Sequence, residues 1–178
     1  MSEALLNNTS HLILGMLASA PKSGYDIKAL ADHSTRFFWQ ISYGQIYPEL
    51  KRLAAAGMAE LEPDPVGGRA RNRYRITELG RRALVDWIAS PTGSFEMRDE
   101  ILLKLFFADS AGEPAALELV RAMKTRHQAA LAQLQEIEVD ARRGGRCTLR
   151  VLRAGLKLHR AYVDVCEDLE REMQPAST

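Results

Sequence analysis

The sequence predicts a mainly α-helical protein with one small β-hairpin, divided into two domains at residues 1–90 and 91–178. Apolar residues recur at helical spacing through most of the 178 residues, which indicates helices. Residues 69–76 instead alternate arginine with other side chains, which is the period of a strand. Turn-forming residues replace the periodic pattern at 91–94, so the domain boundary is expected there.

Composition excludes several classes of protein. The chain has 24 Lys and Arg against 23 Asp and Glu, and 46% of its residues are hydrophobic, as in an ordinary folded protein. Cys147 and Cys166 have no metal-ligand spacing, so we expect reduced thiols, no metal site and no cofactor. No apolar run approaches the length of a membrane span, and no basic residue precedes Lys22 as a secretory signal requires. We therefore expect a cytoplasmic protein that does not enter a membrane.

Two short helices are predicted near the N-terminus. The first ends at Pro21, and its inward side chains are Leu12, Ile13, Met16 and Leu17. Ser23 and Asp26 have the spacing of a capping box, in which each side chain binds a free backbone N–H at the start of a helix. The second helix therefore begins there, and we expect Tyr25, Leu30 and Ala31 to point inward.

A third helix begins with a similar signal. Ser42 and Gln45 repeat the capping spacing, and Gly57 is suited to end the helix. The apolar face is formed by Ile46, Leu50 and Leu53. Pro48 lies inside this pattern and lacks a backbone donor, so we expect a bent or tight first turn.

A hairpin and a fourth helix complete the N-terminal domain. Residues 58–62 form one strand, 63–68 a loop of turn residues, and 69–76 a second strand with a basic face. Thr77 is suited to cap the next helix, and its buried stripe is expected to be Leu79, Ala83, Leu84, Trp87 and Ile88. Three helices, a hairpin and a helix form the plan of a winged helix-turn-helix.

The C-terminal half is helical throughout. Residues 98–108 are apolar on most sides and are expected to be buried. Two long helices follow, from Pro114 to about Arg143 and from about Thr148 to Met173, joined by a Gly-Gly loop as an antiparallel hairpin. We expect the hairpin to form a homodimer through Leu117, Val120, Leu131, Leu134, Leu152, Leu156 and Val163. The alternative is that the hairpin packs only on its own N-terminal domain.

Positive charge is concentrated in one short segment. Residues 67–82 contain six arginines and one acid, Glu78. A charge run is most often a solvated face, but here it adjoins a winged helix-turn-helix, whose second helix enters the major groove of double-stranded DNA. The expected DNA-binding residues are Ser42, Tyr43, Gln45, Tyr47, Lys51, Arg52, Arg69, Arg71 and Arg73. Gln45 has two alternative roles, hydrogen bonding to adenine or capping the helix.

The same residues carry a family resemblance. The stretch SYGQIYPELKRL at 42–53, then Gly57, then GRARNRYRITELG at 68–80, resembles the PadR family of transcriptional regulators. GYDI at 24–27 and RDEILLKLFF at 98–107 resemble it too, so the likeness covers roughly residues 8–172. The family wing often reads Gly-Arg-Pro-Arg-Lys, whereas this chain has Ala70 and Asn72 at the corresponding places.

The resemblance implies a homodimeric and usually repressive regulator, joined through its C-terminal helices and binding an inverted repeat of the ATGT/ACAT type. Some members release DNA when a phenolic acid or another small aromatic molecule binds. The residues expected to contact such an effector are Trp39, Trp87, Phe95 and Phe106, although aromatic residues at helical spacing are more often core.

Two other classes of function are alternatives to DNA binding. We expect no catalytic residues, because the four histidines are scattered and no nucleophile or phosphate-loop motif occurs. His127 and His159 are expected to face each other across the hairpin, as a metal or pH switch or, more simply, as hydrogen-bonded interface residues. A protein-interaction module on a winged scaffold is the second alternative, but it predicts an acidic or apolar face where the arginines lie.

Overall fold

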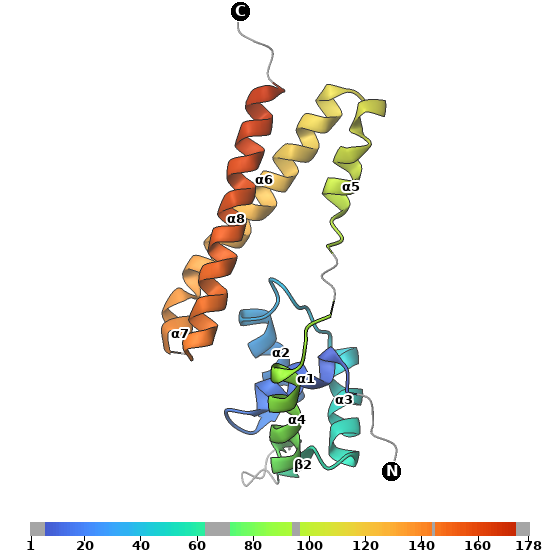
Figure 1. The fold of residues 1–178 in the computed structure, drawn as a ribbon, viewed down its shortest axis with the longest axis vertical. Coiled ribbons are helices and arrows are strands. Elements are labelled where there is room, and N and C mark those ends of the chain that lie inside the picture. The colour runs from blue at the N-terminus through green and yellow to red at the C-terminus, as the bar shows by residue number, and fades with distance from the viewer. Residues whose placement is uncertain (1–5, 63–71, 94–96, 144, 174–178) are drawn as a thin grey trace, which may run out of the picture. The chain divides into compact units, whose positions relative to one another are not determined.

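The computed structural model describes residues 6–62, 72–93, 97–143 and 145–173. The chain divides into two compact units, Met1–Gly93 and Ser94–Thr178, which are described separately (Figure 1). Among the described helices, none is both long enough and apolar enough to cross a membrane.

Unit 1 contains four helices and a small sheet. Its elements are α1 (Asn8–Leu17), β1 (Lys22–Ser23), α2 (Gly24–His33), α3 (Tyr43–Ala55), β2 (Ala59–Glu62), β3 (Arg73–Ile76) and α4 (Glu78–Ala89). The side chains at the centre of its core are completely buried, and they come from the first three helices: Ile13, Leu14, Leu17, Ile27, Ile46, Leu50 and Leu53. The core therefore holds α3 against α1 and α2, as a helix-turn-helix requires.

The sheet has three antiparallel strands in the order β1-β3-β2, rather than the two that the sequence predicts. Strand β1 is only two residues long and pairs Ser23 with Arg73. Strand β3 also pairs with β2, where Leu61 lies opposite Tyr74. The second strand of the hairpin is predicted from residue 69, but residues 69–71 lie outside the described part of the chain. The extra strand joins the start of α2 to the base of the wing.

Helix α4 does not bury the stripe that the sequence predicts. Leu79, Trp87 and Ile88 are exposed, Ala83 and Leu84 are half-buried, and only Gly80 is buried. A Cβ at Gly80 would lie 2.2 Å from the carbonyl oxygen of Met58 and 3.1 Å from Leu14, so α4 meets the core at a backbone contact. The prediction of inward side chains is also wrong for Tyr25 and Leu30 in α2, which are exposed.

Unit 2 is helical. It contains α5 (Glu100–Phe106), the 3₁₀ turn η1 (Ala108–Ser110), α6 (Glu113–Glu136), α7 (Glu138–Arg143) and α8 (Arg146–Glu172). The helix expected from Pro114 to Arg143 is interrupted after Glu136, where Ile137 has a ψ of −1° and ends α6. The expected burial of α5 is also wrong, because Leu103, Phe106 and Phe107 are exposed in this chain.

Helices α6 and α8 pack along each other as the hairpin that the sequence predicts (Figure 1). Val120, Met123 and Cys166 form its buried cluster. Val120, Leu134 and Leu152, which were expected at a dimer interface, are buried within the hairpin itself. Leu117, Leu131, Leu156 and Val163 are half-buried. The interface prediction is therefore corrected for the three buried residues, since a side chain enclosed by its own hairpin has no surface left for a partner.

Candidate nucleic-acid interface

The N-terminus of α3 is formed by a local hydrogen-bond arrangement. The backbone N–H of Ser42 donates to Oε1 of Gln45 at 2.9 Å, and the Ser42 hydroxyl donates to the same oxygen at 3.1 Å. In this structure Gln45 therefore caps the helix, which is one of the two alternative roles expected for it. Pro48 lies inside α3, and the helix continues through it from Tyr43 to Ala55.

One exposed stripe runs along α3, and we call it the α3 stripe: Tyr43, Tyr47 and Lys51. Residues four apart lie on the same helix face, and all three are exposed. The rings of Tyr43 and Tyr47 stack with their centroids 6.2 Å apart, and Lys28 of α2 lies 5.9 Å from the Tyr43 ring. Two phenol hydroxyls and an ammonium group on one face suit contacts with bases and phosphates in a groove.

Gly24 determines how closely α3 approaches α2. A Cβ at this position would lie 2.6 Å from the Tyr47 ring. Only glycine therefore allows Tyr47 to lie across the start of α2 with about half of its surface still exposed. The arrangement fixes the direction of one member of the α3 stripe.

Arg52 points into the domain, unlike the α3 stripe. Its guanidinium donates to Oε2 of Glu49 at 2.9 Å and to the Ser10 hydroxyl of α1 at 2.7 Å. Burial alone would raise the pKa of Glu49, but hydrogen bonds from Arg52 and Ser10 hold this pKa below its usual value. The described contacts of Arg52 therefore join α3 to α1, and its role at the DNA surface stays a prediction.

The base of the wing has two arginines on β3 and is anchored to the helix-turn-helix. Arg73 in β3 donates to the carbonyl oxygen of Pro21 at 2.7 Å, next to β1. Arg75 forms an ion pair with Glu60 across the β2–β3 pair. Arg69 and Arg71 belong to the part of the chain that is not described. Ser42, beside the start of α3, is exposed as the DNA-binding prediction requires.

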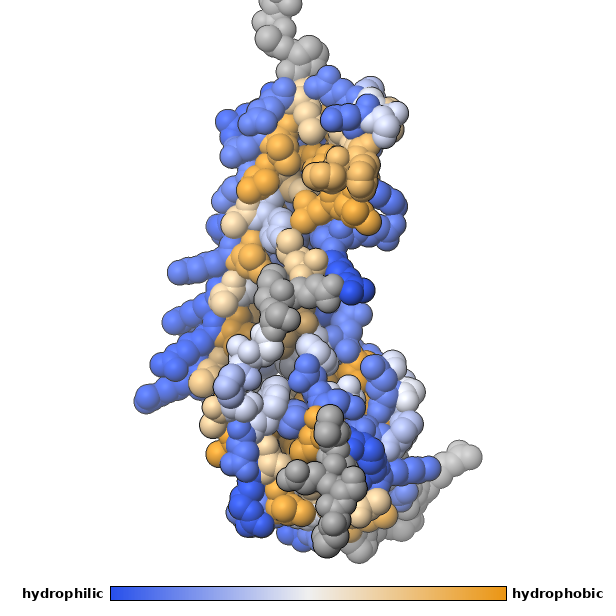
Figure 2. All heavy atoms as spheres, turned by 45° about the vertical axis from the view of Figure 1, so that its right-hand side comes forward, coloured by the Kyte–Doolittle hydropathy of each residue, from blue (hydrophilic) through white to orange (hydrophobic). Residues whose placement is uncertain are grey.

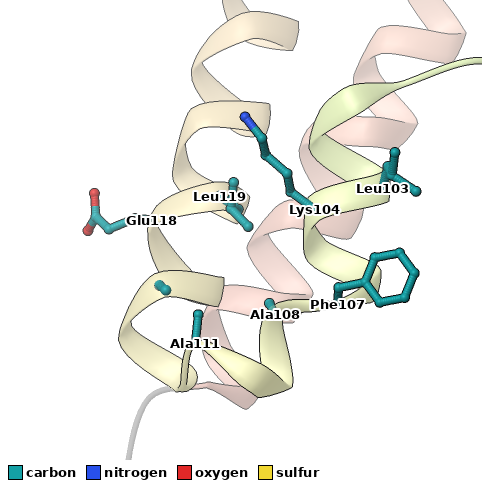
Figure 3. Close-up of a pocket in the computed structure, with 8 residues that line it drawn as sticks. Leu103, Lys104, Phe107, Ala108, Ala111, Glu118 and Leu119 are labelled. Atoms are coloured by element: carbon teal, nitrogen blue, oxygen red, sulfur yellow. The ribbon is translucent and has the colours of Figure 1, made fainter.

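Of the residues expected to contact an effector, Trp39 and Trp87 belong to unit 1 and Phe106 belongs to unit 2. Trp87 stacks on His11 with ring centroids 4.5 Å apart, and Trp39 and Phe106 are exposed. Phe95 lies outside the described residues. The hollow that unit 2 does contain lies between α5 and α6 and measures about 710 Å³. Figure 3 shows its lining, with Leu103 and Lys104 from α5 and Glu118 and Leu119 from α6.

An exposed apolar stripe on α8 was missed by the sequence analysis. We call it the α8 seam: Val151, Ala154, Leu158, Ala161 and Val165, all exposed. Its steps of three and four residues are those of the contact positions in a coiled coil, and this spacing was the signal that could have found it. Hydrophobic side chains are visible along unit 2 in Figure 2, bordered by hydrophilic ones that project outward.

His127 and His159 do face each other across the hairpin, as predicted. Their Nδ1 atoms lie 2.7 Å apart, and Tyr162 stacks on His127 at a centroid distance of 4.1 Å. Burial, with the neighbouring His159 and the charge of Arg126, lowers the pKa of His127 to about 4. No cluster of three or more metal-ligating side chains occurs among the residues with described positions.

Unit 1 thus has the architecture of a winged helix-turn-helix, with an exposed face on α3 and two arginines on strand β3. A family model described as "Transcriptional regulator PadR-like family" matches residues 13–86, and one described as "Virulence activator alpha C-term" matches residues 97–174. The negative transcriptional regulator PadR of Bacillus subtilis is 32% identical over 127 residues, which cover 70% of each chain. The chain belongs to the PadR-like family of transcriptional regulators.

Solved structures agree with this assignment. Bacillus subtilis PadR in complex with operator DNA matches with a TM-score of 0.85 and 26% identity, over 95% of this chain and 99% of that one. The same protein in complex with p-coumaric acid matches with a TM-score of 0.75 and 25% identity, over 94% and 98% of the two chains. The fold therefore extends over both units.

Proposed function

We propose that this PadR-like regulator is a homodimeric repressor that reads an inverted-repeat operator. The observation that carries the proposal is the α3 stripe, which exposes Tyr43, Tyr47 and Lys51 on the helix that enters the major groove in this fold. The Bacillus relative, a negative regulator solved on its operator, supports the same role. Residues 1–90 would bind DNA in the cytoplasm, and residues 91–178 would form the dimer.

The α8 seam supports association between two copies. Three large apolar side chains on it, Val151, Leu158 and Val165, are each at least 50% exposed in the single chain. A two-fold dimer buries the same patch on both subunits, so one continuous stripe is sufficient for the interface. Two DNA-binding units would then present two α3 helices to the two halves of an inverted repeat.

A small aromatic effector is the third part of the proposal. The Bacillus relative was solved with p-coumaric acid, and Trp39, Trp87, Phe95 and Phe106 remain the candidate contacts in this chain. An effector that releases DNA must bind the DNA-incompetent conformation more tightly than the competent one. A phenolic acid that weakens DNA binding and is itself bound less tightly by the DNA complex would satisfy this requirement.

Fluorescence anisotropy on the DNA upstream of the protein's own gene tests the central claim. We expect saturable binding that survives an excess of random duplex and weakens as salt rises. Lys51→Ala should weaken binding, whereas the matched control Arg121→Ala, in unit 2, should not. Binding lost equally to every duplex would contradict sequence-specific reading at that site. No binding at low salt would instead favour the interaction-module alternative.

A further inference from the structure

Five cations line one face of the N-terminal part of α8. We call them the α8 basic stripe: Arg146, Arg150, Arg153, Lys157 and Arg160, all exposed. Their steps of four, three, four and three residues keep them on one side of the helix, over about 21 Å at about 1.5 Å per residue. No acidic residue occurs between Arg146 and Val163. The stripe is therefore a continuous positive face.

Six other cations of unit 2 are held by acids. Ion pairs join Lys104 to Glu100, Arg121 to Glu118, Lys124 to Glu170, Arg126 to Asp99, Arg142 to Glu138, and Arg171 to Asp168. The five members of the α8 basic stripe form no ion pair or hydrogen bond through their side chains with any described residue. The α8 basic stripe therefore differs from these six cations, whose charge is neutralised locally.

The α8 helix of a second copy supplies little of the missing negative charge. Of the acids in α8, Glu167, Asp168 and Glu170 already pair with cations, which leaves Asp164 and Glu172. The stripe also lies about 90° round the helix from the α8 seam, at about 100° per residue. Dimerisation through the seam would therefore leave most of the stripe open to an external polyanion.

We propose that the α8 basic stripe binds the phosphate backbone of duplex DNA outside the segment read by α3. This inference rests on the proposed function. A duplex presents one negative charge per about 1.7 Å of axis, so a stripe of this length meets several phosphates. Four of the five cations are arginines, whose planar guanidinium pairs with phosphate through two hydrogen bonds. Such contacts add affinity without adding sequence preference.

Membrane binding fits the stripe less well. Helices that lie in a bilayer surface carry large apolar anchors, often Trp or Phe, beside their basic face. The adjacent α8 seam includes Ala154 and Ala161, and α8 contains neither Trp nor Phe. The observations therefore favour a ligand recognised by charge alone.

The test compares two triple variants of equal charge change. The stripe variant loses three charges of the α8 basic stripe through Arg150→Gln, Arg153→Gln and Lys157→Gln. The control variant loses three cations that already have acidic partners, through Arg121→Gln, Arg142→Gln and Arg171→Gln. Each full-length variant is titrated by anisotropy against a minimal operator duplex, the same duplex with flanking sequence, and random duplex, over a range of salt. Circular dichroism and sedimentation verify fold and oligomeric state.

We expect the stripe variant to bind flanked DNA on the order of tenfold more weakly than the wild type does. Its association constant K should also depend less on salt, with the slope of log K against log salt reduced by about 0.9 per lost phosphate contact. Its binding to the minimal duplex, and all binding by the control, should be unchanged. Either of two results overturns the inference. The first is that the wild type binds the minimal and the flanked duplex with equal affinity. The second is that the stripe variant binds flanked and random DNA as tightly as the wild type does.

The outcome for the proposed function is separate. If the wild type shows no preference for the operator, sequence-specific reading fails, and the random duplex still tests whether the stripe binds DNA. Loss of binding to phosphatidylserine vesicles by the stripe variant, with unchanged DNA binding, would reassign the stripe to a membrane.

Discussion

The Nδ1 atoms of His127 and His159 lie 2.7 Å apart across the hairpin, and we infer that His127 donates the proton between them. The direction follows from Arg126, whose guanidinium carries only donors and donates to Nε2 of His127 at 3.3 Å. Asp99 in turn accepts from Arg126, and its pKa is lowered by that hydrogen bond. While both imidazoles are neutral, each nitrogen in these contacts therefore has a donor facing an acceptor. An added proton would place two donors face to face.

The histidine pair predicts acid sensitivity of unit 2. The pKa of His127 falls from 6.5 to about 4 on folding, so its stabilising contribution is complete above pH 6.5 and is lost as the pH falls toward 4. The loss should reach at most about 3 kcal/mol. Urea unfolding followed by circular dichroism between pH 7.5 and 4 measures it. His127→Gln should flatten the profile, and the control His33→Gln should not. An unchanged slope in His127→Gln would exclude the pair as its source.

The two faces of α8 predict different outcomes for leucine variants. Leu158→Glu, on the α8 seam, should produce folded monomers because the side chain is exposed in the single chain. Leu152→Ala should instead lower the free energy of unfolding by about 2–5 kcal/mol, because Leu152 is buried in the hairpin. Sedimentation velocity and thermal unfolding distinguish them. A Leu158→Glu dimer as tight as wild type would remove the seam from the interface.

The contact of Arg52 with Glu49 predicts a loss of stability. Arg52→Ala leaves the buried Glu49 carboxylate without its main donor, which should cost about 2 kcal/mol after allowing for the partial exposure of Arg52. Glu49→Gln combined with Arg52→Ala should recover part of this loss, since no buried charge remains. Chemical denaturation measures both. If Arg52→Ala leaves stability unchanged and weakens only DNA binding, Arg52 acts at the DNA surface after all.

Two glycines in helices predict opposite effects of alanine. At Gly80 a Cβ would lie 2.2 Å from the Met58 carbonyl oxygen, so Gly80→Ala must displace α4 from the core and should cost more than about 2 kcal/mol. At Gly15 a Cβ meets nothing within 4 Å, so Gly15→Ala should add about 0.5–1 kcal/mol by improving helix propensity. Thermal unfolding of the pair is the measurement. Similar melting temperatures for the two variants would contradict the close approach at Gly80.

Local signals in the sequence predicted the helix starts well. Ser23 with Asp26, Ser42 with Gln45, and Thr77 all form the hydrogen bonds that their spacing indicates. These interactions span three residues, so they depend little on the rest of the fold. The facing histidines were also found, because helical periodicity placed both near the apolar side of a hairpin.

The sequence predicted which apolar residues recur at helical spacing better than it predicted what those side chains pack against. The apolar face of α4 was assigned to the core, but only Gly80 is buried, Leu84 packs on the core while half-buried, and Ile88 remains exposed. In α8 two apolar stripes compete, and periodicity alone does not show which one meets α6. Strand β1 was missed because two residues are too few for an alternating pattern. The inward position of Arg52 depends on Ser10, 42 residues away in the sequence, which no local pattern reports.

The small interior of unit 2 has a consequence for how much of the regulator a cell contains. Its buried cluster has three members, against thirteen in unit 1. Burial on this scale stabilises a fold weakly, so the hairpin should gain much of its stability when a second copy covers it. Chains present at concentrations below the dissociation constant of the dimer would then remain partly open and be degraded by proteases. Turnover, as well as affinity for DNA, would then set the level of regulation.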